Sequence, residues 1–505
     1  MKLYITVFIG GVVSLALELA ASRLLAPAFG TAELVWSAII GLILLYMAVG
    51  YALGGRWADR SPYPASLYTV LVLAGLAIAA IPLLARPMLR MAAQGMLAWN
   101  LGLIAGPFLF ILVLFVAPVT LLACVSPFAI RLSATQVAES GVTSGRIYAV
   151  STLGSFIGTF LPNLLLIPAL GTRRTFLTLA LLTTATGLWG LWLAQRRRFW
   201  IWCWTLPLLI TLLLIPAGSI KPQKGLVYEQ ESVYNFIQVV ETPDKVRLLY
   251  LNEGQGIHSI LMPGEQILTG GPWDYYLIAP YFNAAPHSPE KVESLLVIGL
   301  AAGTTPSQYT HVYGPIPIDG VEIDPAIVQA GREYFEMTQP NLTVHIGDGR
   351  TYLAQTSRRY SVVAVDAYRL PYIPWHLTTV EFFEQVREHL NEDGVLAINV
   401  GHTDDDWRLV AAMVATLRQV FPSAHVIAVP NSLNAIVVAT VQPTSAGNLG
   451  ENLALLADEN LRAVAQSAVQ HLHLIKSSDL IFRDDRAPVE ALTNDLALRY
   501  VLGIQ

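Results

Sequence analysis

The sequence reads ESLLVIGLAAGTTPSQ at residues 293–308, IDGVEIDP at 318–325, LTVHIGDGRTY at 342–352 and YSVVAVDAY at 360–368. Each stretch contains a short apolar run, typical of a buried parallel strand, that ends near Gly, Asp or Glu. Helical patterns follow these runs, so strands and helices alternate. The pattern predicts a mainly parallel sheet with helices on both faces. Polar residues then lie at the carboxyl ends of the strands, where such sheets bind nucleosides.

The same alternation extends through the C-terminal part of the chain, which we take as one domain over residues 290–505. The apolar runs at 423–430 and 434–441 have no helix between them, so the last strand is expected to run antiparallel. Residues 226–285 alternate between apolar and polar side chains and contain turn residues such as Asn252 and Gly264. They predict a small antiparallel β segment in front of the α/β domain.

Residues 1–220 differ sharply from the rest of the chain. The whole chain is 54% hydrophobic and only 13% charged, and the acidic residues of this part are Glu18, Glu33, Asp59 and Glu139. Crossing a bilayer takes about 20 apolar residues. We identify seven apolar segments of that kind, near residues 4–22, 35–55, 66–88, 101–125, 147–170, 175–194 and 199–218. The sequence therefore predicts a multi-pass helical membrane domain, with the lipid bilayer as its partner.

The side of the membrane is less well determined by the sequence. Basic residues divide almost evenly between the two sets of loops, although the cluster Arg196–Arg198 favours the cytoplasm for its loop. Seven spans would then place the α/β domain outside, whereas a domain that uses an intracellular nucleoside belongs in the cytoplasm. We expect a cell-membrane (inner-membrane) protein with a cytoplasmic C-terminal domain. Glu18 and Arg23 lie near the end of the first span, where an ionisable group is costly and a functional role is one hypothesis. We expect instead that they form an ion pair or reach the interface.

Composition excludes several classes of function. The net charge of -5 gives no basic surface for nucleic acid. The two cysteines, Cys124 and Cys203, lie in apolar runs without the spacing of metal ligands, so no metal is expected.

Five positions of the α/β domain are candidates for nucleoside binding, and a sixth is a candidate for chemistry. Gly299 and Gly303 bracket the turn after the first strand, and Glu322 ends the next strand, where a carboxylate meets ribose hydroxyls. Asp348 and Gly349 follow the third strand; the aspartate could accept from an exocyclic amine of the base, or simply form a turn. Asp366 ends the fourth strand, where it could take a proton or hold a cation.

Taken in this order, these motifs resemble the spermidine synthase (polyamine aminopropyltransferase) family. The β segment with Tyr234 and Asn235, and the pair Tyr275 and Tyr276, are also similar to that family, and the resemblance spans about residues 226 to 440. The whole chain resembles bacterial variants fused to a membrane domain, through the runs ALELAASRLLAPAFG, VGYALGGRWADR, YAVSTLGSFIGTFLPNLLLIPALGTRR and DDRAPVEAL.

The resemblance implies a Rossmann-like fold of the class I methyltransferase type and decarboxylated S-adenosylmethionine as donor. It implies that Glu322 holds the ribose, Asp348 the adenine, and that Asp366 accepts the proton of the attacking amine. Asn235, Tyr275, Tyr276 and Arg369 would line the acceptor site. The partners would be an adenosyl donor and an amine acceptor, and a homo-oligomer of this chain is a further expectation.

The sequence departs from the family at four positions. Ala302 stands where the glycine turn normally carries an Asp, and Arg369 replaces a second acidic residue. Asn235 replaces a glutamine, and Ser432 a tyrosine. Two alternatives therefore stay open: a methyl or other alkyl transferase that uses S-adenosylmethionine, and a non-catalytic adenosyl sensor coupled to the membrane domain.

Overall fold

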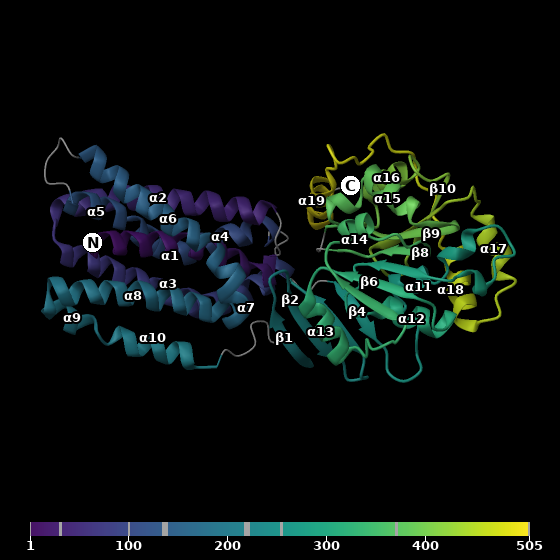
Figure 1. Ribbon diagram of the computed structural model, residues 1–505, viewed down its shortest axis with the longest axis horizontal. Helices are drawn as coiled ribbons and strands as arrows, with labels where there is room; N and C mark the ends of the chain where they lie inside the picture. The colour runs from purple at the N-terminus through teal and green to yellow at the C-terminus, as the bar shows by residue number, and fades with distance from the viewer. Residues whose placement is uncertain are drawn as a thin grey trace. The chain divides into compact units, whose positions relative to one another are not determined.

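A computed structural model describes residues 2–29, 33–98, 102–133, 140–216, 223–252, 256–368 and 372–502. The chain divides into two compact units (Figure 1). The helical unit comprises Met1–Pro222 and Glu229–Phe236, and the α/β unit comprises Gln223–Tyr228 and Ile237–Gln505. The short segment Glu229–Phe236 thus groups with the helices, although it continues the first strand of the β segment.

Within its described residues, the helical unit contains seven stretches long and apolar enough to cross a membrane, in agreement with the predicted spans. Its helices are α1 (Lys2–Phe29), α2 (Glu33–Arg60), α3 (Pro64–Ala98), α4 (Gly102–Ala123), α5 (Val125–Ser133), α6 (Ser140–Leu161), α7 (Ile167–Leu170), α8 (Thr172–Ala194), α9 (Arg196–Trp202) and α10 (Thr205–Leu214). A π-helical turn, η2 (Pro162–Leu166), joins α6 to α7 within one span.

Glycines bring the helices of this unit together. A Cβ atom added at Gly11 of α1 would lie 2.1 Å from the Ser151 carbonyl oxygen of α6. One added at Gly75 of α3 would lie 2.0 Å from Thr184 Oγ1 of α8. Without a hydrophobic driving force between helices in lipid, such close backbone approach supplies much of the packing energy.

The expected ion pair between Glu18 and Arg23 is absent. The Arg23 guanidinium instead donates to the carbonyl oxygens of Ser232 at 2.8 Å and Tyr234 at 3.3 Å, and to that of Val233. A long side chain near a span end can reach such acceptors, which lie more than 200 residues away in the sequence.

The α/β unit contains two sheets. The first is antiparallel where its register is resolved and has the strand order β1-β2-β3-β4, with β1 (Leu226–Glu231), β2 (Phe236–Glu241), β3 (Arg247–Leu251) and β4 (Ile257–Leu261). The predicted β segment therefore ends at Leu261. Two short helices follow it, α11 (Pro272–Tyr276) and the 3-10 helix η3 (Ala279–Phe282).

The second sheet has seven strands in the order β10-β11-β9-β8-β5-β6-β7. Its strands are β5 (Leu295–Ile298), β6 (Ile318–Glu322), β7 (Leu342–Ile346), β8 (Tyr360–Val365), β9 (Leu390–Gly401), β10 (Ser423–Ala428) and β11 (Asn434–Thr440). Strands β5 to β9 pair in parallel, and β11 runs antiparallel to both neighbours, as predicted. The chain leaves β5 in one direction for β6 and β7 and returns on its other side at β8, which creates a topological switch point.

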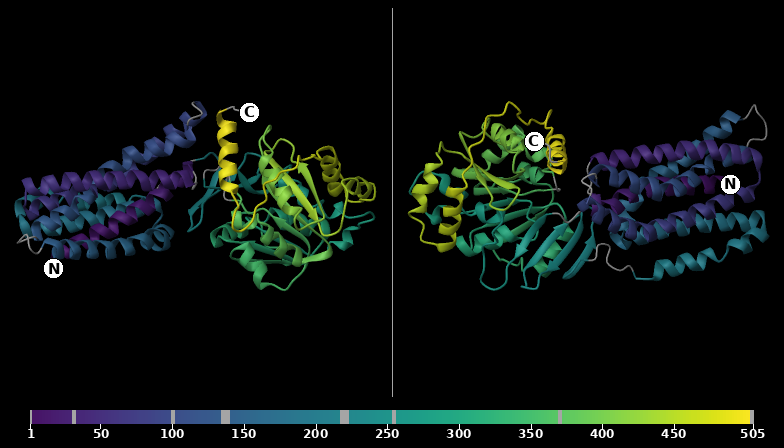
Figure 2. Two further views of the ribbon diagram at one scale, coloured as in Figure 1. Left: turned by 90° about the horizontal axis from the view of Figure 1, so that it is seen from above. Right: turned by 180° about the vertical axis from the view of Figure 1, so that it is seen from behind.

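Alternate side chains of β5 enter two separate cores, one on each face of the sheet. Leu296 and Ile298 join the core under α14 (Gly349–Gln355), α15 (Val380–Glu388), α16 (Arg408–Leu417) and α19 (Val489–Leu502). Leu295 and Val297 join the core under α11, α12 (Thr304–Tyr313), α17 (Gly447–Leu453) and α18 (Glu459–Gln470). Figures 1 and 2 show these helices on both faces of the sheet. Burial on both faces explains why the strands are continuous apolar runs.

Candidate functional site

The turn after β5 requires glycine at both of its ends. Gly299 and Gly303 have φ angles of 87° and 89°, in the left-handed region that favours glycine. A Cβ atom added at Gly299 would lie 2.6 Å from the Asp366 carbonyl oxygen, and one added at Gly303 would lie 2.6 Å from Met337 Cγ. The turn therefore packs directly against the end of β8, and Gly303 begins helix α12.

Glu322, at the end of β6, ties this turn to the next loop. Its carboxylate accepts from the Ala301 amide at 2.9 Å and from the Asp324 amide at 3.1 Å. The side chain is buried, and burial raises the pKa of the Glu322 carboxyl to about 7. Each carboxylate oxygen keeps a further lone pair, so the group can still accept hydrogen bonds from two neighbouring hydroxyls.

Asp366, at the end of β8, is surrounded by groups that stabilise its charge. The Asn399 side-chain amide donates to its Oδ1 atom at 2.9 Å. Burial raises the pKa of the Asp366 carboxyl to about 6, against the opposing effect of hydrogen bonds from Asn399, Trp273 and Tyr276. A carboxylate with a pKa near neutrality is suited to accepting a proton.

Asp348 lies at the same edge of the sheet but has different partners. Its Oδ1 atom accepts from the Thr351 amide at 2.9 Å and so caps helix α14. Its Oδ2 atom lies 2.7 Å from His376 Nε2, and this hydrogen bond lowers the pKa of the Asp348 carboxyl to about 2. The helix-capping role agrees with the turn interpretation of Asp348, and the adenine contact stays a prediction.

Glu322, Asp348 and Asp366 are each linked, directly or through a neighbouring residue, to the end of β5 or to the turn after it, and their convergence on one site stays a prediction. Gly299 touches Asp366, and Ala301 donates to Glu322. A Cβ atom added at Gly349, next to Asp348, would lie 2.3 Å from Ile298 Cγ2. Only glycine therefore allows α14 to begin so close to β5.

The predicted acceptor residues are not gathered in the same way. Tyr276 is fully buried beside Asp366 and donates to the Val365 carbonyl at 3.2 Å. The Tyr275 hydroxyl instead pairs with Ser467 of α18 at 2.9 Å. Asn235 belongs to the segment Glu229–Phe236 of the helical unit, and its amide donates to Ser232 Oγ at 2.8 Å. Arg369 lies outside the described residues.

Two of the family departures can be seen in the structure. Ala302 is buried and its amide donates to Ser259 Oγ at 2.9 Å, so the turn offers a methyl group where the family has a carboxylate. Ser432 accepts from the Asn434 side chain at 2.7 Å.

Three contacts of the site were missed by sequence reasoning: Asn399, Trp273 and His376. Asn399 is a polar residue near the carboxyl end of the apolar strand β9, a signal that could have identified it. Trp273 and His376 carry no such signal, since α11 and the 3-10 helix Trp375–Leu377 reach the site only through tertiary packing.

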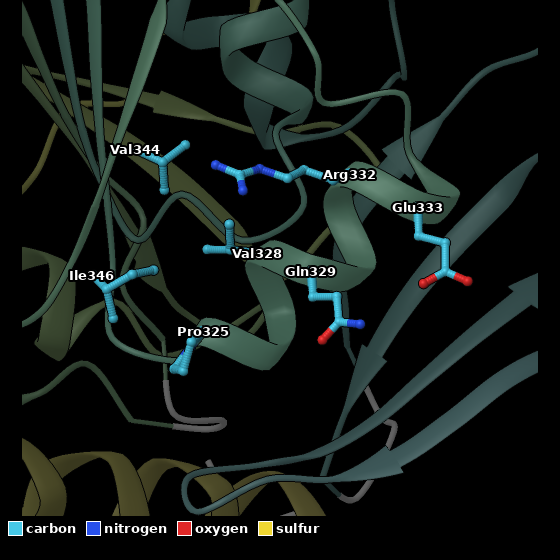
Figure 3. Close-up of a pocket in the computed structure, with 7 residues that line it drawn as sticks. All are labelled: Pro325, Val328, Gln329, Arg332, Glu333, Val344 and Ile346. Carbon is cyan, nitrogen blue, oxygen red and sulfur yellow. The ribbon is translucent and has the colours of Figure 1, made fainter.

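A surface pocket lies beside this edge of the sheet, between α13 (Pro325–Tyr334) and β7. Figure 3 shows the residues that line it: Pro325, Val328, Gln329, Arg332, Glu333, Val344 and Ile346. None of these is a predicted site residue. Among the described residues, no group of three or more His, Cys, Asp or Glu side chains is placed to hold a metal ion.

Comparison with known proteins agrees with the geometry of the α/β unit. The sequence model of the spermine/spermidine synthase domain matches residues 285–450. A probable polyamine aminopropyl transferase of Bifidobacterium longum is 32% identical over 288 residues, which cover 54% of this chain and 63% of that protein. The polyamine aminopropyltransferase of Vibrio vulnificus is 32% identical over 225 residues, which cover 41% of this chain and 69% of that protein.

More distant similarities also occur. The mouse eEF1A lysine and N-terminal methyltransferase is 28% identical over 162 residues, which cover 30% of this chain and 23% of that protein. The crystal structure of a probable spermidine synthase from Corynebacterium glutamicum aligns at a TM-score of 0.40 and 20% identity, covering 52% of this chain and 99% of that one. With its spermine/spermidine synthase domain and its similarity to the Vibrio vulnificus enzyme over more than two thirds of that protein, the chain belongs to the polyamine aminopropyltransferase family.

Proposed function

We propose that this protein is a membrane-bound aminopropyltransferase that uses decarboxylated S-adenosylmethionine and an amine. The amine nitrogen attacks the carbon beside the sulfonium, a C–N bond forms, and the C–S bond breaks. Methylthioadenosine leaves as a neutral thioether, and the nitrogen loses one proton. Asp366 is the group proposed to accept that proton.

The observation that carries the proposal is the environment of Asp366. The carboxylate is held by Asn399 at 2.9 Å, and its pKa of about 6 leaves it mostly charged but still basic at neutral pH. An ammonium has no lone pair, so a base beside the acceptor nitrogen is a chemical requirement of the transfer.

The donor is proposed to bind with its ribose on Glu322 and its adenine near Asp348. Glu322 is fixed by the Ala301 and Asp324 amides, so its free lone pairs are already oriented. Such preorganisation reduces the entropy lost on binding. Gly299 and Gly303 let the turn pack against the end of β8 and against Met337, which fixes the turn beside Glu322.

Methyl transfer from intact S-adenosylmethionine is the second candidate, and Ala302 is the observation that favours it. Without a carboxylate in the turn, the chain lacks the group that grips the donor's amino end in the family. The similarity to a methyltransferase over 162 residues points in the same direction.

One assay separates the two candidates. The purified full chain is incubated with either donor and a panel of amines, and the nucleoside products are identified by mass spectrometry. Aminopropyl transfer predicts methylthioadenosine that appears only with decarboxylated donor and amine together. S-adenosylhomocysteine from the intact donor, with no reaction of the decarboxylated one, would establish the methyl-transfer alternative instead.

We also propose that the protein resides in the cell membrane with its α/β unit in the cytoplasm, where adenosyl donors are made. Seven crossing helices then place the N-terminus on the opposite side. A reporter active only in the cytoplasm, fused after Gln505, is expected to be active. An inactive reporter there, together with an active one fused before Met1, would reverse this orientation.

A further inference from the structure

Helices α1 and α6 of the helical unit run side by side in the same direction. A Cβ atom added at Gly154 would lie 2.2 Å from the Phe8 carbonyl oxygen, and one added at Gly158 would lie 2.2 Å from that of Val12. Both residue numbers rise together, so the two helices are parallel, and their backbones are in direct contact through these glycines.

Polar residues occur at every fourth position of both helices along this contact. We call the following residues the polar seam: Ser14, Glu18 and Ser22 of α1, and Ser151, Ser155 and Thr159 of α6 with Asn163 of η2. Residues four apart lie on one face of a helix. Apart from Ser22, which is buried, these residues are half-buried.

The contacts along the seam show which residues of α1 and α6 lie at the same height along the two helix axes. Ser155 Oγ donates to the Gly11 carbonyl at 3.3 Å, and Glu18 is seven residues, or about two turns, beyond Gly11. Asn163 lies five residues beyond Gly158, whose partner Val12 lies six residues before Glu18. Equal rises along parallel helices bring Glu18 and Asn163 to the same level of the seam.

The backbone at this level departs from a regular α-helix. Pro162 lacks an amide hydrogen, and the Ile167 amide donates to the Pro162 carbonyl, five residues back, to form a π-helical turn. Turns of this kind frequently accompany functional sites in helices. Asn163 Oδ1 is buried and has no hydrogen-bond partner among the described residues.

Three of the seam's hydroxyl groups already donate to the protein backbone, while the Glu18 carboxylate and Asn163 Oδ1 remain as acceptors. The hydroxyls of Ser22, Ser155 and Thr159 each donate to a backbone carbonyl, at 2.8, 3.3 and 3.0 Å. Within the described part of the chain no cation or donor contacts the Glu18 carboxylate, and Arg23 is bound to the carbonyls of Ser232 and Tyr234. A carboxylate in a membrane span is costly unless something compensates it.

A ligand that fits this site brings a positive charge and several N–H donors. A protonated primary amine has both, and its hydrocarbon chain would meet the apolar outer face of α6, where Leu153, Phe156 and Phe160 are exposed. A bare metal ion would need a fuller shell of oxygens than one carboxylate and one amide supply.

We propose that Glu18 and Asn163 form an intramembrane binding site for the ammonium group of a protonated alkylamine, whose chain lies along the exposed apolar residues of α6. The site takes the same class of molecule as the proposed acceptor, so the inference rests in part on the proposed function. Binding at the seam nevertheless needs no transfer reaction, and the two can fail separately.

The test uses the full chain in lipid nanodiscs and dodecylamine that carries a photoactivatable diazirine in its chain. Calorimetry against empty nanodiscs measures affinity, and photolabelling locates the chain. We expect Glu18→Gln to weaken binding about tenfold or more, and Asn163→Leu about threefold, as lost charged and neutral hydrogen bonds do. Labels are expected on α6 near Leu153–Phe160 and to be competed by unlabelled dodecylamine.

The matched control is Asp59→Asn, which removes a carboxylate of the same unit that pairs with Arg131 outside the seam. It should bind within twofold of the unaltered chain. The proposal would be overturned if Glu18→Gln bound the amine as tightly as the unaltered chain, or if Asp59→Asn lost as much affinity as Glu18→Gln. It would also be overturned by photolabels away from α1 and α6, or by sodium ions that displace the amine regardless of its chain length. If Glu18→Gln does not fold, unchanged binding by Asn163→Leu would overturn it as well.

Asp366→Asn separates this proposal from the proposed function. The variant should lose turnover and still bind the amine at the seam. If amine binding depends on Glu18 but the unaltered protein never releases methylthioadenosine, the binding site is supported and the proposed aminopropyl transfer is contradicted.

Discussion

The carboxyl ends of β8 and β7 each carry an aspartate, and the two aspartates have opposite chemistry. Asp366 is desolvated and its pKa rises to about 6, whereas Asp348 is hydrogen-bonded by His376 and its pKa falls to about 2. Asp366 directly follows the central strand β8, and Asp348 lies two residues beyond the edge strand β7, so an aspartate near a carboxyl end does not by itself determine the role. The difference comes from burial and from the partners, and it supports the proposal of Asp366 as the base, whereas Asp348 stays charged at neutral pH.

The largest effect is expected from Asp366→Asn. Loss of a positioned base lowers rates by about 10²–10⁴-fold, so the release of methylthioadenosine should nearly disappear while the donor affinity changes little. Asp348→Asn is the matched control, and it should retain most of the turnover at saturating donor. Equal losses in both variants would remove the distinction between the two strand ends.

Glu322→Ala should act on binding and not on the proton transfer. Because a charged hydrogen bond to the ribose is lost, affinity for methylthioadenosine should fall by about 1–3 kcal/mol. Titration calorimetry with both donors and with methylthioadenosine gives this number, and Glu333→Ala, on the solvent side of α13, serves as control. Unchanged affinity in Glu322→Ala would rule out its ribose role.

The stability of the two aspartate variants should change with opposite sign. Asp348 has a lowered pKa, so its charge stabilises the fold above pH of about 4 and this contribution is lost as pH falls through about 2. Asp366 has a raised pKa, so its carboxyl group binds a proton more tightly in the folded protein than in the unfolded chain. The stability that this proton contributes is lost as pH rises from about 4 to about 6.

At pH 7.5, Asp348→Asn should therefore lower the free energy of unfolding by about 1 kcal/mol, after allowance for its partial exposure. Asp366→Asn should raise the unfolding midpoint of the full chain in the same detergent. The change in Asp348→Asn should be absent in a His376→Ala background, because their shared hydrogen bond is already lost. Destabilisation by both single variants would contradict the assigned pKa directions.

The smallest effect is expected from the two neighbouring tyrosines. Tyr276→Phe removes a hydroxyl group that hydrogen-bonds to Asp366. Turnover should fall a few-fold, which corresponds to the free energy of about one neutral hydrogen bond. Tyr275→Phe removes only the contact with Ser467 and should leave turnover within twofold. A larger loss of turnover in Tyr275→Phe than in Tyr276→Phe would indicate that Tyr275 does line the acceptor site.

Much of the α/β fold was predictable from local patterns. The apolar runs that end in Gly299, Glu322 and Asp366 determine the strands, and the missing helix before Asn434 correctly predicted the antiparallel strand β11. The seven apolar segments were identified for the same reason, since length and hydropathy are local properties.

The partners of these residues could not be predicted in this way. Trp273 and Asn399 meet at Asp366 from positions 126 residues apart, and only tertiary packing decides that they do. Of the two outcomes expected for Glu18 and Arg23, an ion pair or a side chain that reaches the interface, the ion pair does not form, for a related reason. Sequence spacing favoured the nearer carboxylate, whereas Arg23 reaches backbone carbonyls of a segment about two hundred residues away.

The central claim is that Glu322, Asp348 and Asp366 surround one adenosine site at the end of β5. A structure of the full chain determined with methylthioadenosine bound tests it most directly. We predict the ribose hydroxyls on the Glu322 carboxylate, the thioether side facing Asp366, and the base between β6 and β7. Nucleoside bound elsewhere, or a ribose without contact to Glu322, would contradict the account.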